Sequence, residues 1–224
     1  MKRALCLFVC LFVGSAHAIP ISITGYDILN ADVSGNGGWR HTYTGAIVNT
    51  GTGQFGPTAS YTGGTGTMAD GLDSLSETDT QLFNVMNNAE ITLYFDDFYA
   101  LNTLELWQGD FFNAVPGGIE SLNATIGALS DTLLGNPFST PGSTLVNRND
   151  SFSFVGSTLA GLITNQITLS SISMGNCCNA FSISEIRLDG IVAAQVPEAA
   201  SLILLGIGMF GVGFASRKKR FSFS

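Results

Sequence analysis

Ala89-Glu-Ile-Thr-Leu-Tyr-Phe95 and Leu101-Asn-Thr-Leu-Glu-Leu-Trp107 are the segments that decide the fold. Apolar and polar residues largely alternate in them, which is typical of strands with one buried and one solvated face. Similar short segments recur from residue 21 to residue 188, and Gly, Asn, Asp and Pro separate them. The sequence therefore predicts an all-β protein, an antiparallel β-sandwich.

A few segments need a separate interpretation. Residues 51–66 are rich in Gly and Thr, which favours a long loop, and residues 127–134 are compatible with a short helix. Asp96 and Asp97 are expected to end a strand at a turn. Trp107 is expected in the core, because aromatic residues of a sandwich are mostly buried.

The C-terminus has three parts. Val196, Pro197 and Glu198 precede an apolar run at 200–215, and a basic cluster follows it: Arg217, Lys218, Lys219 and Arg220. The run is near the short end of the length that crosses a hydrocarbon core of roughly 30 Å. Basic residues after such a run stay on the cytoplasmic side. This pattern predicts a C-terminal transmembrane helix with the preceding residues outside the cytoplasm. The helix is expected to belong to a sorting signal, and the alternative is an ordinary permanent anchor.

The N-terminus is typical of an exported protein. Lys2 and Arg3 precede an apolar stretch at 4–13, and Ala16-His17-Ala18 is a cleavage site of the A-x-A type. The sequence therefore predicts a signal peptide at 1–18, a β-sandwich domain at 19–192 and a sorting signal at 193–224.

The C-terminal pattern resembles the PEP-CTERM signal of bacteria that make extracellular polysaccharide, although Ala199 stands where a second Pro is usual. Substrates with this signal are handled by an exosortase. The resemblance implies an exosortase-type partner, a transient stay in the inner membrane, and a mature form at the cell surface or outside the cell.

The charge of the mature segment excludes one class of partner. Residues 19–195 contain sixteen acidic and three basic residues, which leaves a net charge of −13. Such a surface repels nucleic acid, and it suits cations and high solubility.

Two cysteines, Cys177 and Cys178, remain after the signal peptide is removed. An oxidising compartment permits a disulfide between them, but neighbouring Cα atoms are about 3.8 Å apart, which is below the usual disulfide span. A strained vicinal bridge, two free thiols and bridges to another chain all remain open. With His41 as the only histidine of the domain, two cysteines do not make a zinc site.

The mature segment also resembles the galactose-binding-like jelly roll of discoidin-type domains. Ala69-Asp70-Gly71 precedes the strand at 89–95, and Phe181-Ser-Ile-Ser-Glu185-Ile186-Arg-Leu-Asp-Gly190 closes the domain. The resemblance implies a structural Ca²⁺ held by the carboxylates of Asp70 and Glu185 and the backbone carbonyls of Thr67 and Leu72, with Asp73 and Asp79 as alternatives. The residues themselves also allow an Asx turn at Asp70 and a Glu185 that is solvated or paired with Arg187.

Polar and aromatic residues gather at Trp39, Arg40 and His41, which predicts a glycan-binding loop, and residues 107–113 are a second candidate. Catalysis is not expected: no G-x-S-x-G elbow accompanies His41, and the adjacent Asp96 and Asp97 face opposite ways on a strand. The sequence predicts a non-catalytic structural or carbohydrate-binding component of exopolysaccharide or biofilm. Polysaccharide is therefore a possible partner. The alternatives are an anchored structural surface protein without ligand and a secreted glycan-active hydrolase.

Overall fold

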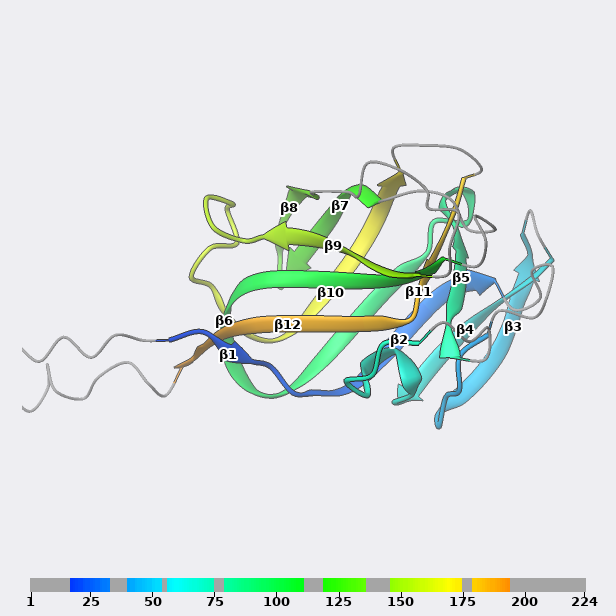
Figure 1. The fold of residues 1–224 in the computed structure, drawn as a ribbon, viewed down its shortest axis with the longest axis horizontal. Helices are drawn as coiled ribbons and strands as arrows, with labels where there is room; N and C mark the ends of the chain where they lie inside the picture. Colours follow the sequence, from blue (N-terminus) through cyan, green and yellow to red (C-terminus); the bar gives the residue numbers. More distant parts are fainter. Residues whose placement is uncertain are drawn as a thin grey trace, which may run out of the picture. The chain divides into compact units, whose positions relative to one another are not determined.

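Strand β6 (Glu90–Asp110) joins the two layers of the fold (Figure 1). Its first half pairs with β2 (Ile23–Asp32) and β10 (Ile163–Met174). Its second half pairs with β9 (Val146–Ser153) and β12 (Glu185–Val192). All four pairings are antiparallel, so the predicted all-β antiparallel sandwich is confirmed.

The computed structural model describes residues 17–32, 40–53, 56–74, 79–110, 119–135, 146–174 and 179–193. They lie in one compact unit, residues 17–193. Within these ranges no α-helix occurs, and no helix there is long and apolar enough to cross a membrane. The predicted signal peptide up to residue 16 and the predicted membrane segment at 200–215 lie outside the described residues. The other elements are β1 (Ile19–Pro20), β3 (Ala46–Thr52), β4 (Pro57–Gly64), η1 (Thr67–Ala69), β5 (Gln81–Asn84), η3 (Val85–Asn87), β7 (Ile119–Ile126), β8 (Leu129–Leu134) and β11 (Ala180–Ile183).

The strands follow a simple order in each layer. The large layer runs β3-β4-β2-β6-β10-β7-β8, and β12 carries β1 at its outer side in the other layer. A separate ribbon of β5 and β11 contains Phe83 and Phe181, whose rings stack with centroids 5.0 Å apart. In Figure 1 the cyan strands β3 and β4 lie beside β2 at the right, and β1 lies beside β12 at the left.

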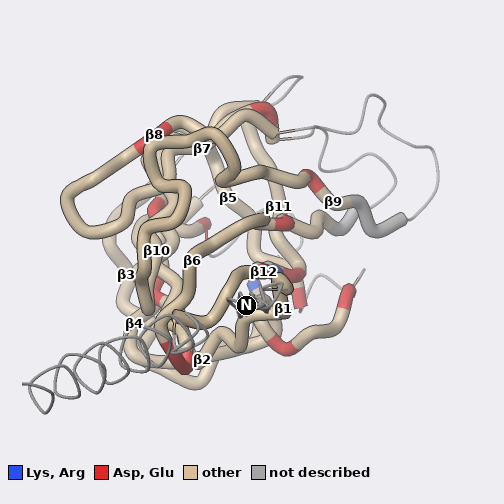
Figure 2. The backbone as a smooth tube through the Cα atoms, turned by 90° about the vertical axis from the view of Figure 1, so that its left-hand side faces the viewer, with Lys and Arg blue, Asp and Glu red and all other residues tan. Residues whose placement is uncertain are grey.

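Alternation along the strands builds the core. In β6, the side chains of Ile91, Leu93, Leu104 and Leu106 are almost completely buried, and they belong to one apolar cluster that both layers line. Burying each such side chain contributes roughly 1.5–3 kcal/mol. Intervening polar residues face outward, so acidic positions are spread over several strands (Figure 2).

Two predicted local structures are wrong. Residues 51–66 are not a long loop, because β3 and β4 form a hairpin through most of them. Residues 127–134 are not helical, because Ile126 pairs with Leu129 across a two-residue turn. Gly127 supplies the positive φ of 59° that this turn needs.

The prediction that Asp96 and Asp97 end a strand is also wrong. The strand continues through both residues. The Tyr99 hydroxyl donates to Asp96 Oδ1 over 2.8 Å, and Asp97 Oδ1 accepts from the backbone N–H of Phe98 over 2.7 Å. Each carboxylate thus accepts one hydrogen bond at the point where β6 passes from one layer to the other.

Candidate functional site

The loop after η1 meets the last strand, β12, around a hollow of about 320 Å³. Asp70, Gly71, Glu185 and Arg187 line it, together with residues 20–23. The structure therefore brings together Asp70 and Glu185, which lie more than a hundred residues apart in the sequence.

Glu185 lies at the base of this hollow. Its side chain is buried, and its Oε1 accepts a hydrogen bond of 3.0 Å from the backbone N–H of Gly71. Its Oε2 is buried and has no hydrogen-bond partner among the described residues. Burial, and after it the nearby Asp70 carboxylate, raise the pKa of Glu185 to about 7, against the opposing effect of the Gly71 N–H.

The contacts of Asp70 and Arg187 correspond to the alternative that the sequence left open. Asp70 Oδ1 accepts from the backbone N–H of Leu72 over 2.9 Å, which is an Asx turn. Arg187 Nη2 donates to the Gly71 carbonyl over 3.1 Å and pairs with Asp73, and its Nε lies 3.8 Å from Glu185 Oε1. A guanidinium therefore already neutralises part of the acidic charge around Glu185.

The fit of a cation rests on two oxygens without partners. Glu185 Oε2 and Thr67 Oγ1 are both buried and unpaired within the described residues. Calcium takes six to eight oxygen ligands, and no three His, Cys, Asp or Glu side chains in the described part of the chain are placed so that they could hold one metal ion together. Of the two alternative carboxylates, Asp73 is paired with Arg187 and Asp79 accepts from the hydroxyl of Ser74. Backbone carbonyls would have to complete the shell.

Trp107 is not a core residue, contrary to the prediction. Leu104 and Leu106 point inward on β6, so Glu105 and Trp107 face outward, and Trp107 is only half-buried. The Arg187 guanidinium lies over its ring, 4.8 Å from the centroid, and the indole N–H donates to Glu105 Oε2 over 3.3 Å. Pairing of β6 with β12 places these side chains side by side.

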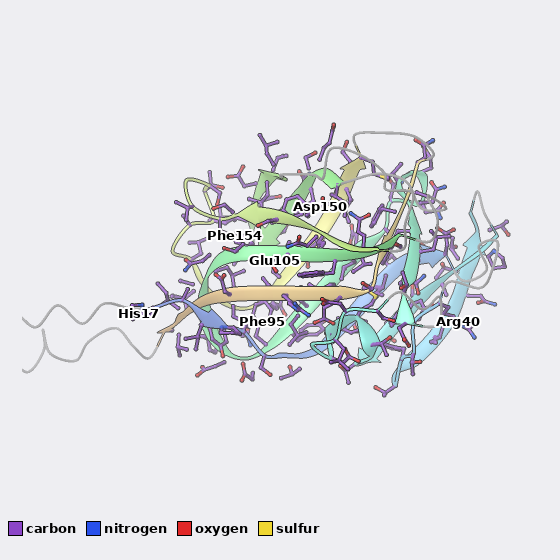
Figure 3. All side chains as sticks on the ribbon, in the orientation of Figure 1. His17, Arg40, Phe95, Glu105, Asp150 and Phe154 are labelled. Atoms are coloured by element: carbon purple, nitrogen blue, oxygen red, sulfur yellow. The ribbon has the colours of Figure 1, made fainter. Side chains whose placement is uncertain are left out.

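The predicted glycan loop is only partly described. Arg40 is exposed and lies at the opposite end of the view from His17 (Figure 3), whereas Trp39 lies outside the described residues. The prediction for His41 is wrong, because its side chain is only 2% exposed and cannot reach a sugar at the surface.

The surroundings of His41 explain its burial. Its ring stacks on Tyr61, with centroids 5.1 Å apart, and its Nδ1 lies 2.9 Å from Gln81 Oε1. Burial lowers the pKa of His41 to about 4. No described contact joins His41 to a serine or a carboxylate, so the Ser-His-Asp arrangement is absent from the described residues.

Other predicted residues lie outside the described residues. These are Cys177 and Cys178 of the vicinal pair, Val196, Pro197 and Glu198 of the sorting motif, and Arg217, Lys218, Lys219 and Arg220 of the basic cluster. For the C-terminal set, comparison with known proteins supplies the evidence.

Residues 195–220 match the PEP-CTERM protein-sorting motif. This match confirms the predicted resemblance of the C-terminus. The motif implies processing by an exosortase and indicates an exported surface protein that is processed at the membrane.

No curated protein matches this sequence. Among solved structures, the fold is similar to the family 32 carbohydrate-binding module of a C. perfringens protein in complex with galactose, with 8% identity over 66% of this chain and 93% of that one and a TM-score of 0.36. It is also similar to such a module from a family 31 glycoside hydrolase of Clostridium perfringens, with 14% identity over 55% and 80% and a TM-score of 0.37. Because the sequence identities and TM-scores are this low, the ligands of these modules say nothing about a ligand of this chain.

Proposed function

We propose that this protein is an exported, non-catalytic component of an extracellular polysaccharide or biofilm, and that its β-sandwich binds carbohydrate. The observation that carries the proposal is the sorting motif at residues 195–220, attached to an acidic all-β domain. The proposal includes a cleaved signal peptide, a jelly-roll sandwich and a membrane-spanning segment that holds the precursor transiently.

The outward faces of the strands support carbohydrate binding. On the large layer, Thr92 and Thr168 join their hydroxyls at 2.9 Å, and the Thr125 hydroxyl donates to Ser130 over 3.1 Å. Ordered hydroxyls can donate to and accept from sugar hydroxyls, and carboxylates can accept from them. A polysaccharide component would use such a surface without any catalytic group.

We also propose a structural Ca²⁺ at the loop of Asp70 and Gly71. The unpaired Glu185 Oε2 and Thr67 Oγ1 support it, with Asp70 as the second carboxylate and the carbonyls of Thr67 and Leu72 as further ligands. The ion would supply positive charge that holds this loop against β12.

The function is tested with the exported protein from its own host and the polysaccharide of that host's matrix. In affinity electrophoresis, the protein should be retarded by the matrix polysaccharide in a concentration-dependent way, without release of reducing ends. Free migration at every concentration would favour the alternative of a structural surface protein without ligand. Release of reducing ends would favour the hydrolase.

A further inference from the structure

We propose that the outward face of the large layer carries a sugar-binding groove over β2, β4 and β6, and that its ligand is a residue of a neutral polysaccharide. The inference rests on the proposed function and adds to it a site and a ligand class. The hollow measures about 370 Å³. Its lining comes from β2, β6, the end of β4 and the segment before β3.

Asp27 and Tyr94 form the floor of the groove. The Tyr94 hydroxyl donates to Asp27 Oδ2 over 2.8 Å, and the backbone N–H of Gly63 donates to Asp27 Oδ1 over 2.8 Å. These two bonds fix the carboxylate in place. Each carboxylate oxygen has room for a further hydrogen bond, so Asp27 can accept from two neighbouring hydroxyls of one sugar.

The ring of Tyr94 adds an apolar surface beside that acceptor. Tyr94 is half-buried on the outward face, next to Asp27. An aromatic ring offers a large apolar area and a polar tip, and here the tip is used by Asp27. The free part of the ring is therefore available to the apolar face of a sugar.

Glycines keep the groove open on the side of β4. Gly63 has a φ of 69°, and a Cβ at this position would meet no atom within 4 Å, so its bare backbone faces open space. At Gly64 a Cβ would lie 2.2 Å from the backbone nitrogen of Gly45, so only glycine permits this packing. The backbone N–H of Gly64 donates to the Tyr43 hydroxyl over 2.8 Å, which fixes this wall from below.

Threonines complete the rim. The Thr44 hydroxyl donates to the Thr65 carbonyl over 3.0 Å and accepts from the Thr65 N–H over 3.1 Å. The Thr24 hydroxyl donates to the Tyr94 carbonyl over 3.3 Å. The rim is thus held by bonds between its own members, and these bonds use the backbone of Thr65 and leave its exposed side chain out.

Charge selects the ligand class. Of the described residues that line the groove, Asp27 alone is charged. A carboxylate without a basic neighbour repels uronic acids and sulfated sugars and accepts from neutral hydroxyls. The groove therefore suits a neutral sugar residue.

A row of threonine side chains beside the groove indicates the direction in which a bound polysaccharide would extend. Thr92 is the cross-strand partner of Asp27, Thr168 is that of Thr92, and Thr125 is that of Thr168. These outward residues extend in one row from the groove across β6, β10 and β7. A chain that places one sugar over Asp27 can continue along this row of hydroxyls.

The test uses affinity electrophoresis of the exported protein through galactan, dextran, mannan and the host's own matrix polysaccharide, with polygalacturonate as the anionic probe. Three variants address the groove: Asp27→Asn, which keeps the size of the side chain, Tyr94→Phe, which keeps the ring and frees the carboxylate, and Thr65→Trp, which blocks the hollow. Thr52→Trp is the matched control, because Thr52 is exposed at the far end of β3. Thermal melting establishes that each variant is folded, and Thr65→Trp carries the test if the other two are not.

We expect at least one neutral polysaccharide to retard the wild type and polygalacturonate to leave it free. Asp27→Asn and Thr65→Trp should weaken binding at least tenfold, and Thr52→Trp should bind as the wild type does. Binding that survives Thr65→Trp overturns the groove and leaves the proposed function standing. Retardation by polygalacturonate overturns the ligand class. A wild type that no polysaccharide retards overturns the proposed function itself.

Discussion

His41 is a buried base whose neutral form the fold requires. Gln81 Nε2 donates to the carbonyls of Asp32 and Leu82, so its Oε1 is the acceptor that faces His41 Nδ1. The proton of the neutral imidazole is therefore assigned to Nδ1. Nε2 is buried without a partner among the described residues, and a second proton there would be costly.

This arrangement predicts an acid-side loss of stability. The folded pKa of His41, about 4, lies below its ordinary value of 6.5, so the unfolded chain binds a proton first. The contribution of neutral His41 to the free energy of unfolding is therefore fully present above pH 6.5. It is lost as the pH falls toward 4, and the loss amounts to up to about 3 kcal/mol. Urea unfolding at pH 7 and at pH 4 measures this loss. The loss should be absent in His41→Gln, whereas the control Arg40→Gln should show the same loss as the wild type.

Asp32 acts in the opposite direction, and the comparison must allow for it. Burial raises the pKa of Asp32 from 3.8 to about 6, so the folded state takes up this proton first and gains stability as the pH falls through that window. The wild-type curve contains both effects. The difference between wild type and His41→Gln isolates the histidine, and an identical pH dependence of the two proteins would refute its role.

The loop of Asp70 gives a second prediction for single residues. If Ca²⁺ binds at Asp70 and Glu185, it should stabilise the fold by about 2.7 kcal/mol at a hundred times its Kd, which corresponds to a Tm shift of very roughly 5–10 °C. Chelator should remove this shift from the wild type but cause none in Asp70→Ala or Glu185→Gln. Glu120→Gln is the control, because Glu120 is exposed on β7. A wild-type melting curve that chelator does not change would exclude the ion.

At the scale of elements, β6 carries the fold because it belongs to both layers. Its alternation was visible in the sequence, and so were the two segments of which it consists. Their union into one strand was not visible, since Asp96 and Asp97 are usual turn residues. In the structure the strand runs through both residues, and their carboxylates accept hydrogen bonds from Tyr99 and from the Phe98 backbone.

This role predicts a marked sensitivity of β6 to cavities. Leu104 is completely buried in the half of β6 that pairs with β12 and β9, so Leu104→Ala should lower the free energy of unfolding by about 2–5 kcal/mol. Leu134 at the end of β8 is 77% exposed, and Leu134→Ala should change it by less than about 0.5 kcal/mol. Urea denaturation measures both. Similar losses from the two substitutions would contradict the assignment of the core.

For the whole molecule, the sequence predicted fold class and sorting better than it predicted the site. Strands of a sandwich alternate apolar and polar residues, and the sorting motif is a short continuous segment. Both features could therefore be recognised in a single sequence. Asp27 and Tyr94 gave no signal, because only the pairing of β2 with β6 brings them together. His41 looked accessible beside Arg40, and its burial comes from Tyr61 and Gln81, which lie far from it in the sequence.

The sorting motif leads to a prediction about the processing of the entire chain. The match at residues 195–220 implies that an exosortase processes the precursor at the membrane. We expect cleavage near Val196, Pro197 and Glu198, because the domain belongs outside whereas the basic cluster holds the apolar run in the membrane. Intact-mass analysis of the exported protein in its own host should show loss of the segment after about residue 198.

Two strains sharpen this experiment. A host without its exosortase should accumulate the uncleaved chain in the membrane fraction, and so should a Pro197→Ala, Glu198→Ala variant in the normal host. Pro141→Ala, a proline substitution outside the motif, is the control and should be cleaved normally. If the mature surface fraction of the normal host retains the full C-terminus, the chain is permanently anchored and the transient role of the tail is wrong. Cleavage that persists without exosortase would instead assign the step to another protease.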